Sequence, residues 1–141
     1  MNNPLFAPVV ALVGWSLIML VWMTLARLDA MKSVDPALTR KPGTRGADLE
    51  AILPAKAQWS SHNYNHLMEQ PTLFYAICIV LALSGGGTDL DVYLAWAYVA
   101  LRVIHSIVQA TVNIVPIRFP VFALATFVLI ALTIRAAVFA I

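Results

Sequence analysis

No charged side chain occurs in residues 1–26, and the first is Arg27. A transmembrane helix needs about 20 mostly apolar residues, so this stretch is long enough to cross a bilayer. A cleaved signal peptide would have a basic start and a shorter apolar core, whereas this chain begins MNNP. The stretch is therefore predicted to be a retained membrane helix.

Three further apolar stretches follow, and 61% of the chain is hydrophobic whereas only 11% is charged. Soluble domains have about 45–50% apolar and about 25% charged residues. We therefore predict an all-α integral membrane protein with a single domain over residues 1–141. Short connections between helices favour an antiparallel four-helix bundle. The helices are expected over residues about 4–28, 56–84, 91–114 and 118–140.

Charge and cysteine content exclude several other classes of protein. The net charge is +2 and no basic patch alternates with aromatic residues, so nucleic acid is not an expected partner. Cys78 is the single cysteine, which excludes an intrachain disulfide and a cysteine-based metal site. His62 and His66 have the spacing of metal ligands but no third ligand nearby, so no metal site is expected.

Orientation is predicted from the lysine and arginine residues of short loops. The connection over residues 29–55 and its border carry most of these residues: Arg27, Lys32, Arg40, Lys41, Arg45 and Lys56. This loop is therefore expected in the cytoplasm, with both termini on the opposite side of the membrane. Arg135, near the C-terminus, is expected to reach out to the interface.

A polar stripe follows one side of the third span. At 100° per residue, an arc of about 100° contains the polar residues of this helix. They are Arg102, His105, Ser106, Gln109 and Asn113. A polar stripe on an otherwise apolar membrane helix is expected to face the interior of the bundle.

The second span has a similar stripe, which consists of Gln58, His62, Asn65, His66 and Glu69. If the two helices are antiparallel neighbours, both stripes converge in the cytoplasmic half of the membrane. Glu69 would then reach Arg102, and an ion pair would satisfy both charges.

Structural interpretations of these residues remain open. The Glu69–Arg102 pair can serve helix register alone, and His62 can lie in the headgroup region. Gln109 and Asn113 can act as interhelical hydrogen-bonding groups. His105 and Ser106 can be satisfied groups of the core.

Two segments, HNYNHLMEQPTLFYA and AWAYVALRVIHSIVQATVNIVPIRFPVF, resemble the MAPEG family, the membrane-associated proteins in eicosanoid and glutathione metabolism. The specific part of the resemblance lies in residues 62–122, in the spacing of Glu69, Arg102, His105 and Arg118, and it suggests a bacterial-type branch. It implies a homotrimer that binds glutathione between neighbouring subunits near the cytoplasmic face.

The resemblance also implies roles for individual residues. Arg118 would stabilise the glutathione thiolate, and Glu69 would engage glutathione and pair with Arg102. The implied glutathione-binding set is His62, Asn65, His66, Glu69, Arg102, His105, Ser106, Gln109 and Arg27. The sequence departs from the family pattern at His62, where an arginine is usual, at His66, where an asparagine is usual, and at Gln109 and Phe122, where tyrosines are common.

The expected function is that of a glutathione-dependent membrane transferase or peroxidase, with glutathione as co-substrate. Its expected partners are a second copy of the chain, lipids and a lipophilic electrophile or lipid hydroperoxide, and its expected location is a bacterial inner membrane. Two alternatives stay open. One is a non-enzymatic lipid- or partner-binding protein of the same fold, and the other is a small transporter or proton relay.

Overall fold

Four helical spans make up most of the protein. The computed structural model describes residues 3–141, and these contain helices and turns but no strand. Each of four segments is long and apolar enough to cross a membrane, which confirms an all-α, multi-pass membrane protein. The long helices are α1 (Phe6–Met31), α3 (Ala55–Leu67), α4 (Gln70–Leu83), α5 (Asp89–Thr111) and α6 (Val115–Ala140).

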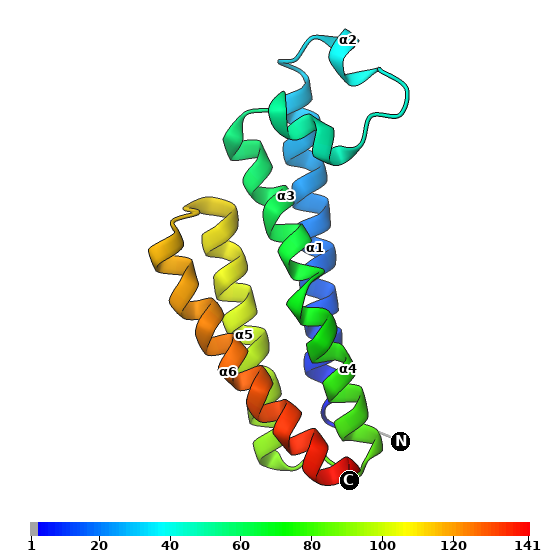
Figure 1. Ribbon diagram of the computed structural model, residues 1–141, viewed down its shortest axis with the longest axis vertical. Helices are drawn as coiled ribbons and strands as arrows, with labels where there is room; N and C mark the ends of the chain where they lie inside the picture. The colour runs from blue at the N-terminus through cyan, green and yellow to red at the C-terminus, as the bar shows by residue number, and fades with distance from the viewer. Residues whose placement is uncertain (1–2) are drawn as a thin grey trace.

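The spans run alternately up and down (Figure 1). α1 and α5 lead toward the end of the bundle that carries the 32–54 connection, which we call the loop end. α3 with α4, and then α6, lead back to the end where both termini lie. α5 packs against α6, α1 against α3, and α4 against α6. The connection at the loop end contains the short α2 (Pro36–Thr39) and a 3-10 turn, η1 (Gly46–Ala51).

The apolar core occupies the half of the bundle near the termini. Phe74 and Tyr98 are both fully buried there, and their rings stack with centroids 4.5 Å apart. Cys78 is also fully buried there. Many large apolar side chains on the outer faces, such as Val10 and Phe127, are exposed. In a membrane protein such outer side chains contact lipid.

A buried ion pair closes the end near the termini. Arg135 does not simply reach out to the interface as expected, because its Nε donates to Asp91 Oδ1 at 2.7 Å. Asp91 is 0% exposed, and its other oxygen accepts from Thr88 and from the Gly87 N–H. The pair joins the start of α5 to the end of α6.

The second span is not one uninterrupted helix over residues 56–84. α3 ends at Leu67, Met68 and Glu69 form a turn, and α4 begins at Gln70. Pro71 explains the break, because proline has no N–H to donate and its ring clashes with the carbonyl four residues earlier. The Leu67 carbonyl therefore has no N–H of residue 71 to accept from, and the turn at Met68 and Glu69 leaves the His66 carbonyl without its usual helical donor.

Candidate functional site

Arg102 is the most deeply buried charged group of the loop-end half of the bundle, with a side chain that is 0% exposed. Its Nη2 donates to the backbone carbonyl of His66 at 3.0 Å and lies 3.0 Å from His66 Nδ1. Arginine has only donors, so Nδ1 accepts and the ring hydrogen of His66 resides on Nε2. The break before Pro71 makes the contact possible, because the His66 carbonyl would otherwise accept from residue 70.

The expected Glu69–Arg102 ion pair is not formed within the single chain. None of the ion pairs among residues 3–141 joins these two residues. Glu69 is exposed in the turn between α3 and α4, and Arg102 instead finds its partner in His66. The physical reason is the helix break, which offers a backbone carbonyl to the guanidinium.

Three rings form one wall beside this contact. His66 and His105 are stacked with centroids 4.9 Å apart and an interplanar angle of 25°. Phe122 of α6 lies 5.3 Å from the His66 centroid and 6.0 Å from that of His105. The rings connect α3, α5 and α6 at one level of the bundle.

A cavity of about 200 Å³ opens against this wall. We call it the arginine pocket; it is lined by His66, His105, Gln109, Val115, Arg118, Phe119 and Phe122. Four residues of the predicted site therefore lie together, including Arg118. Val115 and Phe119 were not predicted to line the site. A signal for them exists in the sequence, because Val115, Phe119 and Phe122 are spaced so that they share one face of the helix that carries Arg118.

Arg118 lies in the first turn of α6 and is held by Asn113. The Asn113 side-chain oxygen accepts from Arg118 Nη1. Asn113 has a φ of 53°, and among residues 3–141 no other residue except glycine has a positive φ. Asparagine tolerates this left-handed conformation better than most residues, so it can both end α5 and orient the guanidinium.

The electrostatic character of the arginine pocket favours an anion. Arg118 supplies a positive charge, Gln109 can donate through its amide, and none of the described lining residues is acidic. Phe119 and Phe122 make the rest of the wall apolar. A compact anionic group with an apolar neighbour therefore fits this site.

Other predicted site residues lie elsewhere in the single chain. His62 Nε2 is 3.3 Å from Glu50 Oε1, with both side chains about half exposed. Arg27 donates to the Gly46 carbonyl at 3.2 Å. Both residues thus hold the 32–54 connection rather than the arginine pocket. Asn65 is exposed on α3.

The inward stripe predicted for the third span is confirmed for Arg102, His105, Ser106 and Gln109, which are all buried. The stripe predicted for the second span is confirmed for Gln58, which is buried, and wrong for the single chain at His62, Asn65 and Glu69, which are exposed. The buried face of α3 consists of Gln58, Ser60, Ser61, Asn63 and Leu67.

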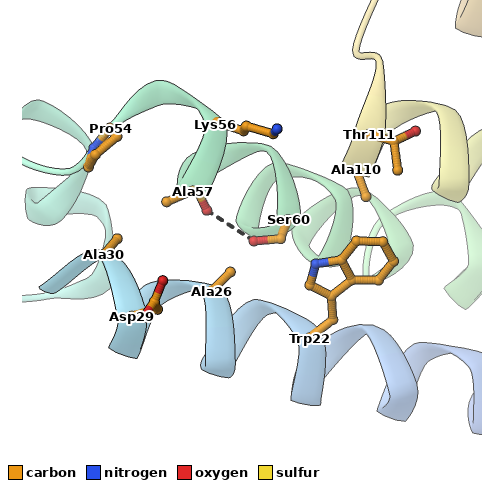
Figure 2. Close-up of a pocket in the computed structure, with 10 residues that line it drawn as sticks. All are labelled: Trp22, Ala26, Asp29, Ala30, Pro54, Lys56, Ala57, Ser60, Ala110 and Thr111. Atoms are coloured by element: carbon orange, nitrogen blue, oxygen red, sulfur yellow. Dashed lines mark hydrogen bonds between the residues drawn. The ribbon is translucent and has the colours of Figure 1, made fainter. Parts of the chain in front are cut away.

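A second, larger cleft of about 480 Å³ lies between α1, α3 and the end of α5, and we call it the loop-end cleft. Figure 2 shows the Trp22 indole pointing from α1 toward Ala110, with Ser60 and Lys56 on the α3 side. The Ser60 hydroxyl donates to the Ala57 carbonyl at 3.0 Å. Sequence patterns did not predict this cleft, because its walls are mostly small residues without a distinctive spacing.

A family model named MAPEG family matches residues 5–138. The chain belongs to the MAPEG family. The match covers α1 to α5, nearly all of α6 and every residue of the arginine pocket, and it confirms the family resemblance of residues 62–122. No curated protein and no solved structure matches the chain. Membership places this MAPEG protein in a family of glutathione and eicosanoid metabolism.

Proposed function

We propose that this MAPEG protein is a glutathione-dependent transferase or peroxidase acting on lipophilic electrophiles or lipid hydroperoxides. The observation that carries the proposal is the position of Arg118, which lines the arginine pocket together with two histidines and Gln109, while none of the described lining residues is acidic. The family relationship makes glutathione the natural thiol for this pocket.

The chemistry requires a thiolate, because a thiol is a poor nucleophile. A free thiol has a pKa of about 8.5, and lowering it to about 6.5 requires about 2.7 kcal/mol of differential stabilisation. A guanidinium beside the sulfur at the edge of a low-dielectric region is a suitable source of this energy. Arg118 is assigned this role.

Two reactions are open to a thiolate held in this way. In conjugation the sulfur attacks an electrophilic carbon, a carbon–sulfur bond forms, the leaving group departs as an anion, and the thiol proton passes to water. In peroxide reduction the sulfur attacks the peroxide oxygen, and a second glutathione thiol completes the reaction. Two thiols are then oxidised to one disulfide, and the hydroperoxide becomes an alcohol and water.

Access for the lipophilic partner is provided by the outer surface of the bundle. An apolar groove of about 350 Å³ runs between α4 and α6 and is lined by Gln70, Leu73, Ile77, Thr126, Leu129, Ile130 and Thr133. A substrate dissolved in lipid can therefore approach along α6, the helix that carries Arg118.

We further propose a homotrimer with glutathione between neighbouring subunits. Glu69 and Asn65 are exposed on the second span of the single chain. A charged side chain facing hydrocarbon costs about 2.5–3.5 kcal/mol, so such groups normally face protein. A neighbouring copy that covers this face would bring Glu69, Asn65 and His62 to the peptide part of glutathione. The buried Arg102, His105 and Ser106 would position the ring wall of the arginine pocket, and Arg27 would hold the 32–54 connection.

The proposed orientation places the loop end in the cytoplasm of a bacterial cell, with both termini across the inner membrane. Lys32, Lys41 and Arg45 all lie in the loop-end connection, and short loops rich in such residues remain cytoplasmic. Both the arginine pocket and the loop-end cleft include residues near the loop-end terminus of α5. Cytoplasmic glutathione would therefore reach them directly.

The test is turnover of a nitro-substituted aryl chloride and of an organic hydroperoxide with glutathione by the purified protein. Arg118→Ala should lose most turnover while the assembly measured by light scattering in detergent is unchanged. Arg45→Ala, at an exposed position of the connection, is the matched control and should keep full turnover. Unchanged rates in Arg118→Ala would remove Arg118 from the mechanism.

The second candidate function is that of a non-enzymatic binding protein, and one observation favours it. His62, at the position where the family usually has arginine, is engaged with Glu50 of the connection rather than turned to the pocket. Thermal unfolding with glutathione distinguishes the two candidates, because saturation at about 100 times Kd stabilises the protein by about 2.7 kcal/mol per site. Absence of a shift at millimolar glutathione would support the binding protein.

A further inference from the structure

Buried polar groups without protein partners occur on both α3 and α5. Asn63 is 1% exposed, and neither its side-chain oxygen nor its nitrogen has a hydrogen-bond partner among residues 3–141. Within the same described range, the hydroxyl of Ser106, at 0% exposure, and Nε and Nη1 of Arg102 have none either. A buried polar group without a partner costs about 1–3 kcal/mol. Such a concentration of them in a membrane bundle therefore calls for a ligand.

Two contacts fix the relative register of these groups. At the deep end, Arg102 of α5 donates to the carbonyl of His66 of α3. Toward the loop end, Ser60 of α3 and Ala110 of α5 line the same cleft. The helices are antiparallel, so moving from His66 back to Ser60 follows the same direction as moving from Arg102 on to Ala110 (Figure 1).

Asn63 and Ser106 each lie half-way between these two contacts. Asn63 is three residues before His66 and three after Ser60, and Ser106 is four residues after Arg102 and four before Ala110. The two side chains therefore lie at the same level, one helical turn below the loop-end cleft and one turn above Arg102. Asn63, Ser106 and Arg102 therefore form one series of unpartnered groups between the cleft and the His66 contact.

The series lies on the flank of α5 away from the arginine pocket. With Arg102 at zero, His105 and Gln109 fall at about 300° and 340°, whereas Ser106 and Ala110 fall at about 40° and 80°. His105 and Gln109 line the arginine pocket, and Ala110 lines the loop-end cleft. The inner face of α5 thus divides into two sides that meet at Arg102.

We propose that Asn63, Ser106 and Arg102 hold a file of bound water molecules that opens into the loop-end cleft. Buried water typically makes about three hydrogen bonds to otherwise unsatisfied polar groups, and the series supplies donors and acceptors at every turn. Figure 2 shows the cleft into which the file would open, with Ser60 and Ala110 on its border near the Trp22 indole. The file is an aqueous route to Arg102 that is separate from the arginine pocket.

The experiment uses hydroxyl radicals that a pulse of X-rays generates from water, so that a thiol is oxidised rapidly only where water lies beside it. Ser106→Cys is nearly isosteric, and the native Cys78, buried in the apolar core at 0% exposure, serves as the internal reference. The thiol introduced by Ser106→Cys should be oxidised at least about tenfold faster than Cys78. Equal oxidation of the two thiols would overturn the proposal.

A second pair of variants tests where the file opens. Ala110→Phe fills the mouth from α5 and should slow oxidation of the Ser106→Cys thiol to the level of Cys78. Ala57→Phe narrows the same cleft from α3, outside the polar series. It should also slow oxidation of the Ser106→Cys thiol, and it replaces Ala110→Phe if that variant does not fold. A thiol introduced by Gln109→Cys in the arginine pocket should keep its rate. Rapid oxidation at position 106 in both filled variants would show that the water does not enter through the cleft.

Discussion

The guanidinium of Arg102 donates to the backbone carbonyl of His66, 36 residues earlier in the chain, at a distance of 3.0 Å. The contact joins the break in the second span to the polar face of α5. It also fixes the ring of His66, which stacks on His105 and lines the arginine pocket. The site thus depends on a backbone defect rather than on a pair of opposite charges.

Removal of this guanidinium should destabilise the protein. In Arg102→Met the carbonyl and ring nitrogen of His66 lose their donor, and an unsatisfied buried group costs about 1–3 kcal/mol. Thermal unfolding in detergent should show a lower midpoint. Arg45→Met, where the side chain is 81% exposed, should leave the midpoint unchanged. Equal midpoints for the wild type and Arg102→Met would contradict the assigned contact.

Pro71 is expected to act on the site through the backbone. In Pro71→Ala the second span can continue as one helix, so residue 70 can donate to the His66 carbonyl in place of Arg102. Glutathione turnover should fall although the protein remains folded, because Arg102 no longer holds His66. Pro36→Ala in the exposed connection is the control for loss of a proline and should keep normal turnover. A Pro71→Ala protein with normal kinetics would show that the break is not needed.

Variants of Asn113 distinguish the effect of its backbone conformation from its role in orienting Arg118. Asn113→Gly keeps the positive φ of 53° without strain but removes the oxygen that accepts from Arg118. Turnover should fall by about tenfold, and stability should fall by no more than about 1.5–3 kcal/mol, the contribution of one hydrogen bond to a charged group. Asn113→Ala should lose more stability than Asn113→Gly, because alanine also disfavours this backbone conformation. If both variants retain wild-type turnover, Asn113 does not position Arg118.

The Asp91–Arg135 pair is expected to stabilise the bundle without serving the site. Asp91→Asn leaves the Arg135 guanidinium without its counter-charge, and stability should fall because the Asp91 side chain is fully buried although that of Arg135 is 30% exposed. The unfolding midpoint should fall while turnover of the folded fraction is normal. The double variant with Arg135→Met should lose less stability than the sum of the single variants. Strictly additive losses would show that the two side chains act independently.

Much of the fold could be predicted from hydropathy alone. The uncharged run that ends at Arg27 is long enough to cross a membrane, and the inward face of α5 follows from the helical period of Arg102, His105, Ser106 and Gln109. These predictions succeed because a polar group in a membrane helix has only protein to satisfy it.

The second span could not be predicted in the same way. The helix break at Met68 and Glu69 affects only Glu69 of the predicted stripe, because the other members lie on the uninterrupted α3. His62 is exposed there and is held by Glu50 of the connection, a contact that the helical period alone does not predict. Partners contributed by backbone carbonyls, such as that of His66, leave no mark in the pattern of side chains. The arginine pocket was predicted in part, since Arg118 and His105 followed from the resemblance, whereas the role of Asn113 required its backbone conformation.

Ultraviolet difference absorbance of glutathione added to the purified protein near neutral pH tests the central claim most directly, because a thiolate absorbs where a thiol does not. The account predicts a thiolate band with the wild-type protein that saturates with glutathione and is lost in Arg118→Ala under conditions where glutathione still binds. Bound glutathione without a thiolate band in the wild type, or an undiminished band in Arg118→Ala, would contradict it.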